Sequence, residues 1–206
     1  MMKCAVFASG GGSNFQALIN RRESGELHVD FALFMGNNST ALAFDRARKL
    51  GIPVVHCSPS HFDNEQLYAE HLLDVLKQHS IELIILAGYM KKIPASVVTA
   101  FKHKIVNIHP ALLPAFGGAG LYGQKVHQAV LDYGAKVSGV TVHFVDEEYD
   151  HGPVIMQDTV PVLDSDDAHT LAQRVLVLEH ASYWKAIEAI AQNRITVKGR
   201  NVYGRV

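Results

Sequence analysis

The sequence lacks several features on which large classes of protein depend. Only two of its 206 residues are cysteine, and Cys4 and Cys57 form neither a CxxC pair nor a zinc-like spacing. Without a disulfide framework, the chain is expected in a reducing compartment, the cytoplasm. No apolar run reaches the length of a membrane-spanning helix, and the run from Cys4 to Ala8 is too short for a signal peptide. We therefore expect no membrane partner.

An excess of charge of either sign is also missing. Lys and Arg number 19 against 20 Asp and Glu, which leaves no basic field to hold nucleic acid. The 12 histidines include no HxH or HxxxH pair of the kind that binds zinc, so no metal is expected. Small molecules remain as the expected partners. The length favours one domain, residues 1–206, as a monomer or homodimer.

Apolar, strand-like runs alternate with helical patterns along most of the chain. This alternation predicts an α/β fold with a mostly parallel, Rossmann-like sheet and helices on both faces. Two later strands, Lys136 to Val145 and Pro153 to Val162, are expected to pair across an acidic turn and to add an antiparallel C-terminal edge. Asp166 or Asp167 is expected to cap a long helix, and the tail from Ile195 to form an edge strand or to fray. The expected parallel strands include 3–9, 29–35, 53–57 and 81–87, with helices at 41–50 and 62–79.

A glycine loop joins the first strand to the first helix. It reads Gly10-Gly11-Gly12-Ser13-Asn14 and precedes a helical pattern that starts at Phe15. Glycines let the backbone approach a ligand, and the first N–H groups of a helix attract anions, so the loop is a candidate phosphate site. The Rossmann fingerprint would need glycine in place of Phe15, and the Walker A pattern would need a lysine after the glycines. A plain tight turn is the alternative interpretation.

The segment 104–114, K-I-V-N-I-H-P-A-L-L-P, contains the strongest candidates for catalytic side chains. Residues i and i+2 of a strand face the same side, so Asn107 and His109 are expected to emerge together at the end of a strand. An amide can donate to an oxygen that becomes negative during acyl transfer, and a histidine can move a proton near neutral pH. The pair suggests carbonyl chemistry. A turn asparagine beside a partly buried histidine is the alternative.

A second segment, 137–155, alternates like a strand and then breaks into the acidic turn that carries Asp150. Together, N-I-H-P-x-L-L-P and S-G-V-T-V-H-F-V-D-x-x-Y-D-x-G-P-V-I resemble the folate-dependent formyltransferase family, over a stretch from Val6 to about Trp184. The resemblance implies the fold of that family. It also implies direct transfer of a formyl group from 10-formyltetrahydrofolate, the co-substrate, to the primary amine of 5-phosphoribosylglycinamide in purine biosynthesis.

The resemblance also assigns roles to particular residues. It implies that Asn107 donates to the tetrahedral oxyanion, that His109 shuttles the proton, and that Asp150 orients His109 and holds its pKa up. The glycine loop is implied to hold the phosphate of the acceptor, and the loop after the strand 81–87 to bind folate. The implied binding residues are Gly12, Ser13, Asn14 and Glu179 for the acceptor, and Met90, Lys91, Lys92, Ile93 and Asn107 for the folate.

The chain departs from the family pattern at two positions. Lys91 stands where arginine is usual, and Glu65 stands where relatives often carry an arginine that meets the acidic tail of the folate. A lysine cannot make the bidentate contact of an arginine, and a glutamate reverses the charge. We therefore expect the folate tail to be held less by arginine here than in other members.

Two enzymes that share the N-x-H core and the distant Asp are rivals, and both fit poorly. A formyltetrahydrofolate hydrolase is expected to carry a regulatory domain before the first strand and a methionyl-tRNA formyltransferase an extra basic C-terminal domain, and neither domain is expected here. A non-catalytic nucleotide-binding sensor is the rival from another class.

The glycine-rich segment 115–125 is interpreted as a mobile lid, with a plain connecting loop as the alternative, and His143 is interpreted as a core residue of its strand.

Overall fold

The computed structural model describes all 206 residues, and the chain divides into two compact units, Met1–Val106 and Asn107–Val206. Seven strands form one sheet in the order β3-β2-β1-β4-β5-β6-β7, and two more, β8 and β9, pair with each other. The mostly parallel sheet with an antiparallel edge confirms the predicted fold class. The two units are described separately below, and the expected single domain stays a prediction.

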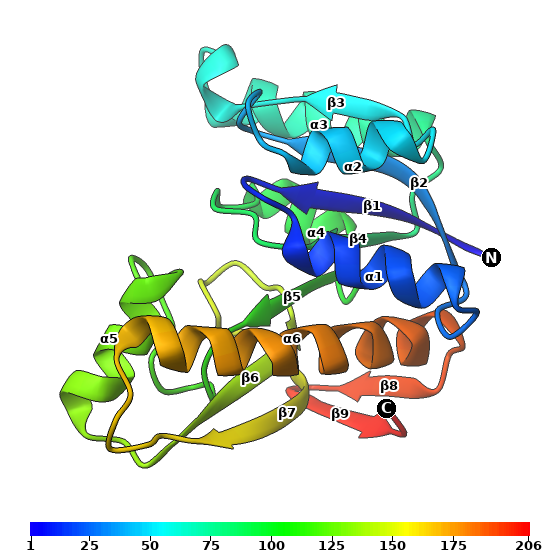
Figure 1. Cartoon of the computed structure of the whole chain (residues 1–206). Coiled ribbons are helices and arrows are strands. Elements are labelled where there is room, and N and C mark those ends of the chain that lie inside the picture. Colours follow the sequence, from blue (N-terminus) through cyan, green and yellow to red (C-terminus); the bar gives the residue numbers. More distant parts are fainter. The chain divides into compact units, whose positions relative to one another are not determined.

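The first unit is built from parallel strands joined by helices (Figure 1). β1 pairs in parallel with β2 and β4, and β2 pairs in parallel with β3. β5 (Ile105–His109) begins at the end of this unit and continues into the next. The other elements are β1 (Met2–Ala8), α1 (Ser13–Glu23), β2 (Val29–Gly36), α2 (Ala43–Lys49), β3 (Val54–His56), the 3-10 helix η1 (Pro59–His61), α3 (Glu65–Gln78), β4 (Leu83–Leu86) and α4 (Ala95–Ala100).

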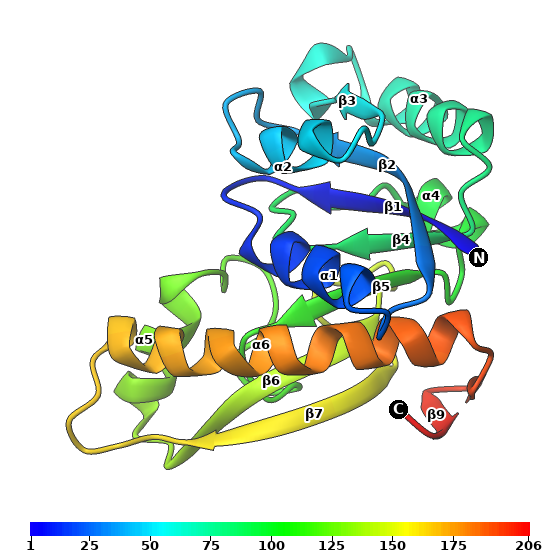
Figure 2. The same ribbon diagram turned by 45° about the vertical axis from the view of Figure 1, so that its right-hand side comes forward.

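The burial of β1 is that of a central strand in a parallel sheet. Every side chain from Cys4 to Ala8 is completely buried, as expected of a strand with both faces covered. α1 and α2 lie on one face of the strands and α3 and α4 on the other (Figure 2), the arrangement that right-handed crossovers produce when the strand order reverses at β1. The predicted helix 62–79 begins later, at Glu65, because Asn64 accepts a hydrogen bond from the Leu67 N–H and caps it.

The second unit places helices against an antiparallel pair of strands. β6 and β7 are antiparallel neighbours, as the sequence predicted, and α6 packs against both. Asp167 caps α6 in a reciprocal pair of hydrogen bonds with Thr170, which confirms the predicted cap. The elements are α5 (Gln124–Tyr133), β6 (Val137–Phe144), β7 (Val154–Pro161), α6 (Ala168–Ala191), β8 (Ile195–Lys198) and β9 (Asn201–Gly204), and Val130, Val140, Leu171 and Val175 form a fully buried core among them.

The tail after α6 differs from the expectation of an edge strand or a frayed end. β8 and β9 pair with each other as a hairpin, with Lys198 opposite Asn201. Gly199, at a φ of +60°, and Arg200 make the two-residue turn. A residue with positive φ suits this tight connection, so the chain folds back on itself instead of joining the main sheet. None of the helices combines the length and the apolar character that crossing a membrane requires.

Candidate active site

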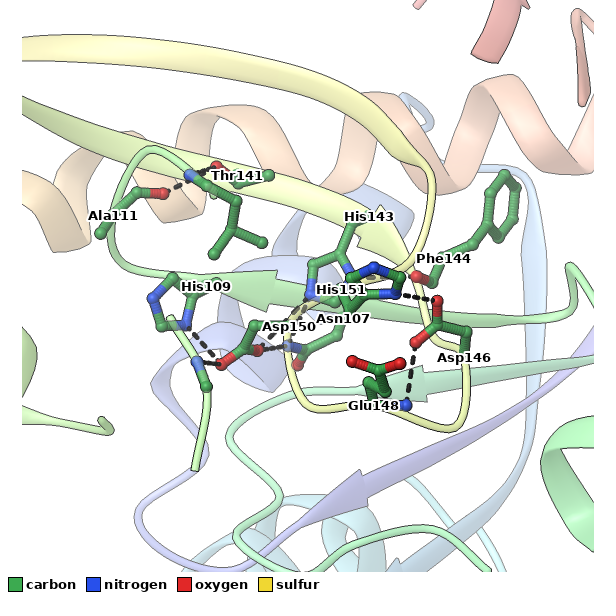
Figure 3. A network of polar contacts seen from close by, with 12 residues as sticks. Asn107, His109, Ala111, Thr141, His143, Phe144, Asp146, Glu148, Asp150 and His151 are labelled. Carbon is green, nitrogen blue, oxygen red and sulfur yellow. Dashed lines mark hydrogen bonds and ion pairs between the residues drawn. The ribbon is translucent and has the colours of Figure 1, made fainter. Parts of the chain in front are cut away.

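β5 ends in the two side chains that the sequence singled out. Asn107 and His109 are the third and fifth residues of the strand, and His109 is only 4% exposed. Asp150 approaches them from the turn between β6 and β7, with its Oδ2 3.5 Å from His109 Nδ1 and its Oδ1 3.5 Å from Asn107 Nδ2 (Figure 3). The structure therefore brings the predicted trio together within the second unit.

Asp150 is held in an unusual backbone conformation. Its φ is +53°, in the left-handed region where residues other than glycine are uncommon. Gly118 donates its N–H to Asp150 Oδ2 at 3.0 Å. Burial raises the pKa of Asp150, but its contacts with His143 and His109 and the N–H of Gly118 outweigh burial, so the net pKa lies below its ordinary value. Asp150 is thus ionised at neutral pH.

His143 completes the network, and the sequence did not reveal that role. Its Nδ1–H donates to the carbonyl of Phe144 at 2.9 Å, which leaves Nε2 as an acceptor for Asn107 Nδ2 at 3.1 Å. This bond fixes which end of the Asn107 amide faces His143 and Asp150. The pairing register of β6 and β7 shifts between Val142 and His143, and an irregularity of this kind re-aims a side chain. His143 is 1% exposed, so its interpretation as a core residue was right but incomplete.

His109 has a hydrogen-bond acceptor beside each ring nitrogen. Its Nε2–H donates to the carbonyl of Phe116 at 2.9 Å, and Nδ1 faces Asp150. Burial lowers the pKa of His109; Asp150 and the Phe116 carbonyl oppose this, and the net pKa still lies below its ordinary value. The neutral ring therefore predominates at neutral pH. The protonated ring has a partner ready at both nitrogens, which suits a group that accepts and returns a proton.

The glycine-rich segment after Pro114 packs directly onto the trio. It supplies both the Phe116 carbonyl and the Gly118 N–H. A Cβ added at Gly117 would lie 2.4 Å from Leu113 Cδ2 and 3.1 Å from Asp150 Cβ, so a larger residue there would have to displace the Leu113 side chain and press on Asp150. The segment is a connecting loop in contact with the candidate catalytic residues, and its mobility stays a prediction.

The glycine loop of the first unit has the form of a helix N-terminus. Gly12, at a φ of +71°, precedes α1, and no side chain caps this helix. Arg46 of α2 donates from Nε to the Gly11 carbonyl at 2.9 Å and brings a positive charge next to the loop. A Cβ at Gly12 would lie 2.8 Å from Ala43 Cβ, so the close approach of α2 also requires glycine. The exposed amide-rich loop and the arginine together favour an anion.

The loop after β4 is tied to the end of β1. Ser9 donates its N–H to the Gly88 carbonyl at 3.0 Å, and its hydroxyl accepts from the Met90 N–H at 2.8 Å. Met90, Lys91 and Lys92 are exposed and Ile93 is buried. These residues belong to the first unit, whereas Glu179 is buried on α6 in the second. No group of three or more His, Cys, Asp or Glu side chains is placed to hold a metal ion.

Known proteins match this chain over most of its length. The formyl transferase family matches residues 2–187. A chloroplastic phosphoribosylglycinamide formyltransferase of Vigna unguiculata is 46% identical over 193 residues, which are 94% of this chain and 62% of the plant protein. The phosphoribosylglycinamide formyltransferase of Bacillus subtilis (strain 168) is 38% identical over 190 residues, 92% of this chain and 95% of that protein.

A solved structure shows the same likeness. The crystal structure of glycinamide ribonucleotide transformylase 1 from Symbiobacterium toebii matches with a TM-score of 0.93 at 35% identity, and the match covers 100% of this chain and 95% of that one. The chain therefore spans less than two thirds of the plant relative and nearly the whole length of the two bacterial proteins.

Proposed function

The chain belongs to the formyl transferase family, and we propose that it transfers the formyl group of 10-formyltetrahydrofolate to the primary amine of 5-phosphoribosylglycinamide, a step of purine biosynthesis. The observation that carries this proposal is the network of Asn107, His109 and Asp150, in which an amide donor and a buried imidazole meet beside an ionised carboxylate. The names of the relatives support the choice of acceptor.

Each member of the network has a distinct task in the proposed reaction. The amine nitrogen attacks the formyl carbon, and the carbonyl oxygen becomes an oxyanion. Asn107 donates to it the Nδ2–H that makes only the long 3.5 Å contact with Asp150 Oδ1 in the free protein, while the other Nδ2–H stays on His143. The new carbon–nitrogen bond is made in this attack, and collapse of the tetrahedral intermediate then restores the carbonyl and breaks the bond between the formyl carbon and the folate nitrogen. His109 takes the proton that the amine loses and returns it to the folate nitrogen. Asp150 stays ionised and stabilises the protonated ring, and no covalent enzyme intermediate is needed.

The binding assignments belong to the same proposal. Gly12, Ser13 and Asn14 hold the phosphate of the acceptor at the start of α1, where Arg46 adds charge. Glu179 binds the acceptor, and Met90 to Ile93 together with Asn107 bind the folate. Lys91 and Glu65 are exposed, and neither side chain has the guanidinium group that binds a carboxylate in a bidentate contact. Neither residue therefore binds the acidic tail of the folate in that way.

An assay with both substrates tests the proposed function. Absorbance of the folate product is followed with and without the amine acceptor, and His109→Ala serves as the inactive control. Product formation that requires the amine supports formyl transfer. Product formation that proceeds without it would assign the chain to the hydrolases, and binding of both compounds with no turnover would assign it to the non-catalytic sensors.

A further inference from the structure

The hairpin β8–β9 lies beyond residues 2–187, where the family match ends. Its turn residue Arg200 nevertheless reaches the turn between β6 and β7 that carries Asp150. β9 also contacts β7, next to that turn. Figures 1 and 2 show the hairpin in the part of the second unit where β7 begins. The β8–β9 hairpin, which lies outside the matched residues, therefore contacts the turn that carries the candidate catalytic residue Asp150.

Arg200 binds His151, the residue that follows Asp150, through its ring and its backbone. Its Nη2 donates to the His151 carbonyl at 2.5 Å. Its Nη1 lies 3.3 Å from His151 Nδ1 and 3.2 Å from Nε2. A position nearly equidistant from both ring nitrogens at this range lies over the face of the ring, because an in-plane position would collide with the carbon between them. Arg200 thus places Nη1 over the face of the imidazole while Nη2 binds the backbone, a combination that the two nitrogens of the arginine fork allow.

His151 in turn contacts Asp146, another residue of the 146–152 turn. Its Nδ1 lies 2.8 Å from Asp146 Oδ2, and Asp146 Oδ1 accepts the Glu148 N–H at 3.0 Å (Figure 3). Arg200, His151 and Asp146 therefore form a chain of contacts across the 146–152 turn. Asp150 lies inside this turn at a φ of +53°, a conformation that is uncommon for residues other than glycine.

We propose that Arg200 is a positioning residue for the transfer reaction, which keeps the 146–152 turn in the form that aims Asp150 at His109 and Asn107. The inference rests on the proposed function for its kinetic consequence. Its structural content, the coupling of Arg200 to the Asp150 carboxylate, does not depend on the identity of the substrates. Arg200 touches none of the reacting atoms and acts only through His151 and the turn.

The kinetic test compares Arg200→Ala with Lys198→Ala, a matched control that removes one positive charge from the same hairpin and has no hydrogen bond to the turn. A displacement of about 1 Å in a reacting site can cost roughly 100-fold in rate. We expect Arg200→Ala to lower kcat on the order of 10-fold, since Gly118 and Asn107 still hold the carboxylate. KM for both substrates should stay near the wild-type value. Arg200→Lys should resemble Arg200→Ala, because a single ammonium cannot lie over the ring and bind the carbonyl at once.

The pKa of His109 separates positioning from a simple charge effect. The charged or titratable groups that act on His109 are Asp150, His143 and His127. Loss of a positive charge alone raises the pKa of a histidine, whereas displacement of Asp150 lowers it. Histidine NMR titration should therefore move His109 to lower pH in Arg200→Ala and not in Lys198→Ala.

The double variant with Asp150→Asn completes the test. Residues that act as one unit are non-additive, so Arg200→Ala should cost little more once Asp150 has lost its charge. An unmoved or rising His109 titration together with wild-type kcat would overturn the proposal, and so would losses that multiply in the double variant. If the wild-type chain transfers no formyl group, the proposed function fails, while the NMR titration still decides whether Arg200 positions Asp150.

Discussion

Replacing Asp150 with asparagine tests the centre of the proposed mechanism. Asparagine keeps the shape of the side chain and leaves Gly118 an acceptor, but His109 loses its neighbouring carboxylate. At the 3.5 Å between Asp150 Oδ2 and His109 Nδ1, Coulomb's law gives about 1 kcal/mol in water and about 5 kcal/mol at an effective dielectric constant near 20. The Asp150 side chain is 12% exposed, so its interaction with a protonated His109 lies between these limits.

The direction of the change follows from the causes of the His109 pKa. Burial already lowers that pKa, and the Asp150 carboxylate opposes the effect of burial. Without the carboxylate, burial is less opposed, so the pKa falls further and the protonated ring is lost at a lower pH. The acidic limb of kcat/KM should move to lower pH with it. Proton transfer by a positioned side chain accelerates a reaction roughly 100- to 10000-fold, and Asp150→Asn should lose a large part of this acceleration in kcat/KM.

Four proteins measure the effect: wild type, Asp150→Asn, His109→Ala and the double variant. Histidine NMR titration gives the pKa of His109 in the two proteins that retain the ring, and kcat/KM against pH is recorded for all four. Because the two residues act as one unit, the double variant should be little worse than His109→Ala. An unmoved titration, or losses that multiply, would refute the argument that Asp150 works through His109.

Four further predictions concern the acceptor, the oxyanion and stability. A dephosphorylated acceptor should bind far more weakly than the phosphate ester if the 10–14 loop holds the phosphate, and isothermal titration with equal affinities would contradict this assignment. Asn107→Ala should lower kcat roughly 100- to 1000-fold with little change in binding of the acceptor, and normal kcat in this variant would move the oxyanion role elsewhere. His143→Phe should lower kcat less, because the Asn107 donor remains, although the amide is freed to rotate and Asp150 loses a contact that lowers its pKa. Burial lowers the pKa of His127 below its ordinary 6.5, so the free energy of unfolding should be fully retained above that pH and decrease as the pH falls through the folded-state pKa. Urea titrations should show a smaller decrease in His127→Leu, and an unchanged pH dependence would rule out this histidine as a source.

Strand alternation predicted that Asn107 and His109 face the same side, and the resemblance to the formyltransferases joined Asp150 to them. Asn107 and His109 lie two residues apart on β5, and the acidic break after β6 supplies Asp150. The role of His143 could not be predicted in this way, because the register irregularity at Val142 and His143 changes where the side chain points without leaving a mark in the apolar pattern. The only signal in the sequence was a histidine between two apolar strand residues, Val142 and Phe144.

The remaining differences also have local causes. α4 was missed because it is only six residues long and contains adjacent valines, which favour strands. The pair Gly199-Arg200 marks a hairpin turn, but the tail was interpreted by its position at the end of the chain. Side-chain contacts such as that of Arg200 with His151 join residues 49 positions apart, and no spacing rule predicts them.

The hydrogen bond from Asn107 to His143 also limits which sequences this site can tolerate. His143 gives its Nδ1–H to Phe144, so in that tautomer it offers position 107 a lone pair and no proton. Aspartate, the nearest match to asparagine in shape, would bring a second carboxylate to a position where Asp150 Oδ1 lies 3.5 Å away and would have no N–H to donate when ionised. Spontaneous deamidation at position 107 would therefore inactivate a molecule that is otherwise folded and intact. The strand geometry of β5 therefore preserves activity as well as structure to the extent that it slows hydrolysis of this amide.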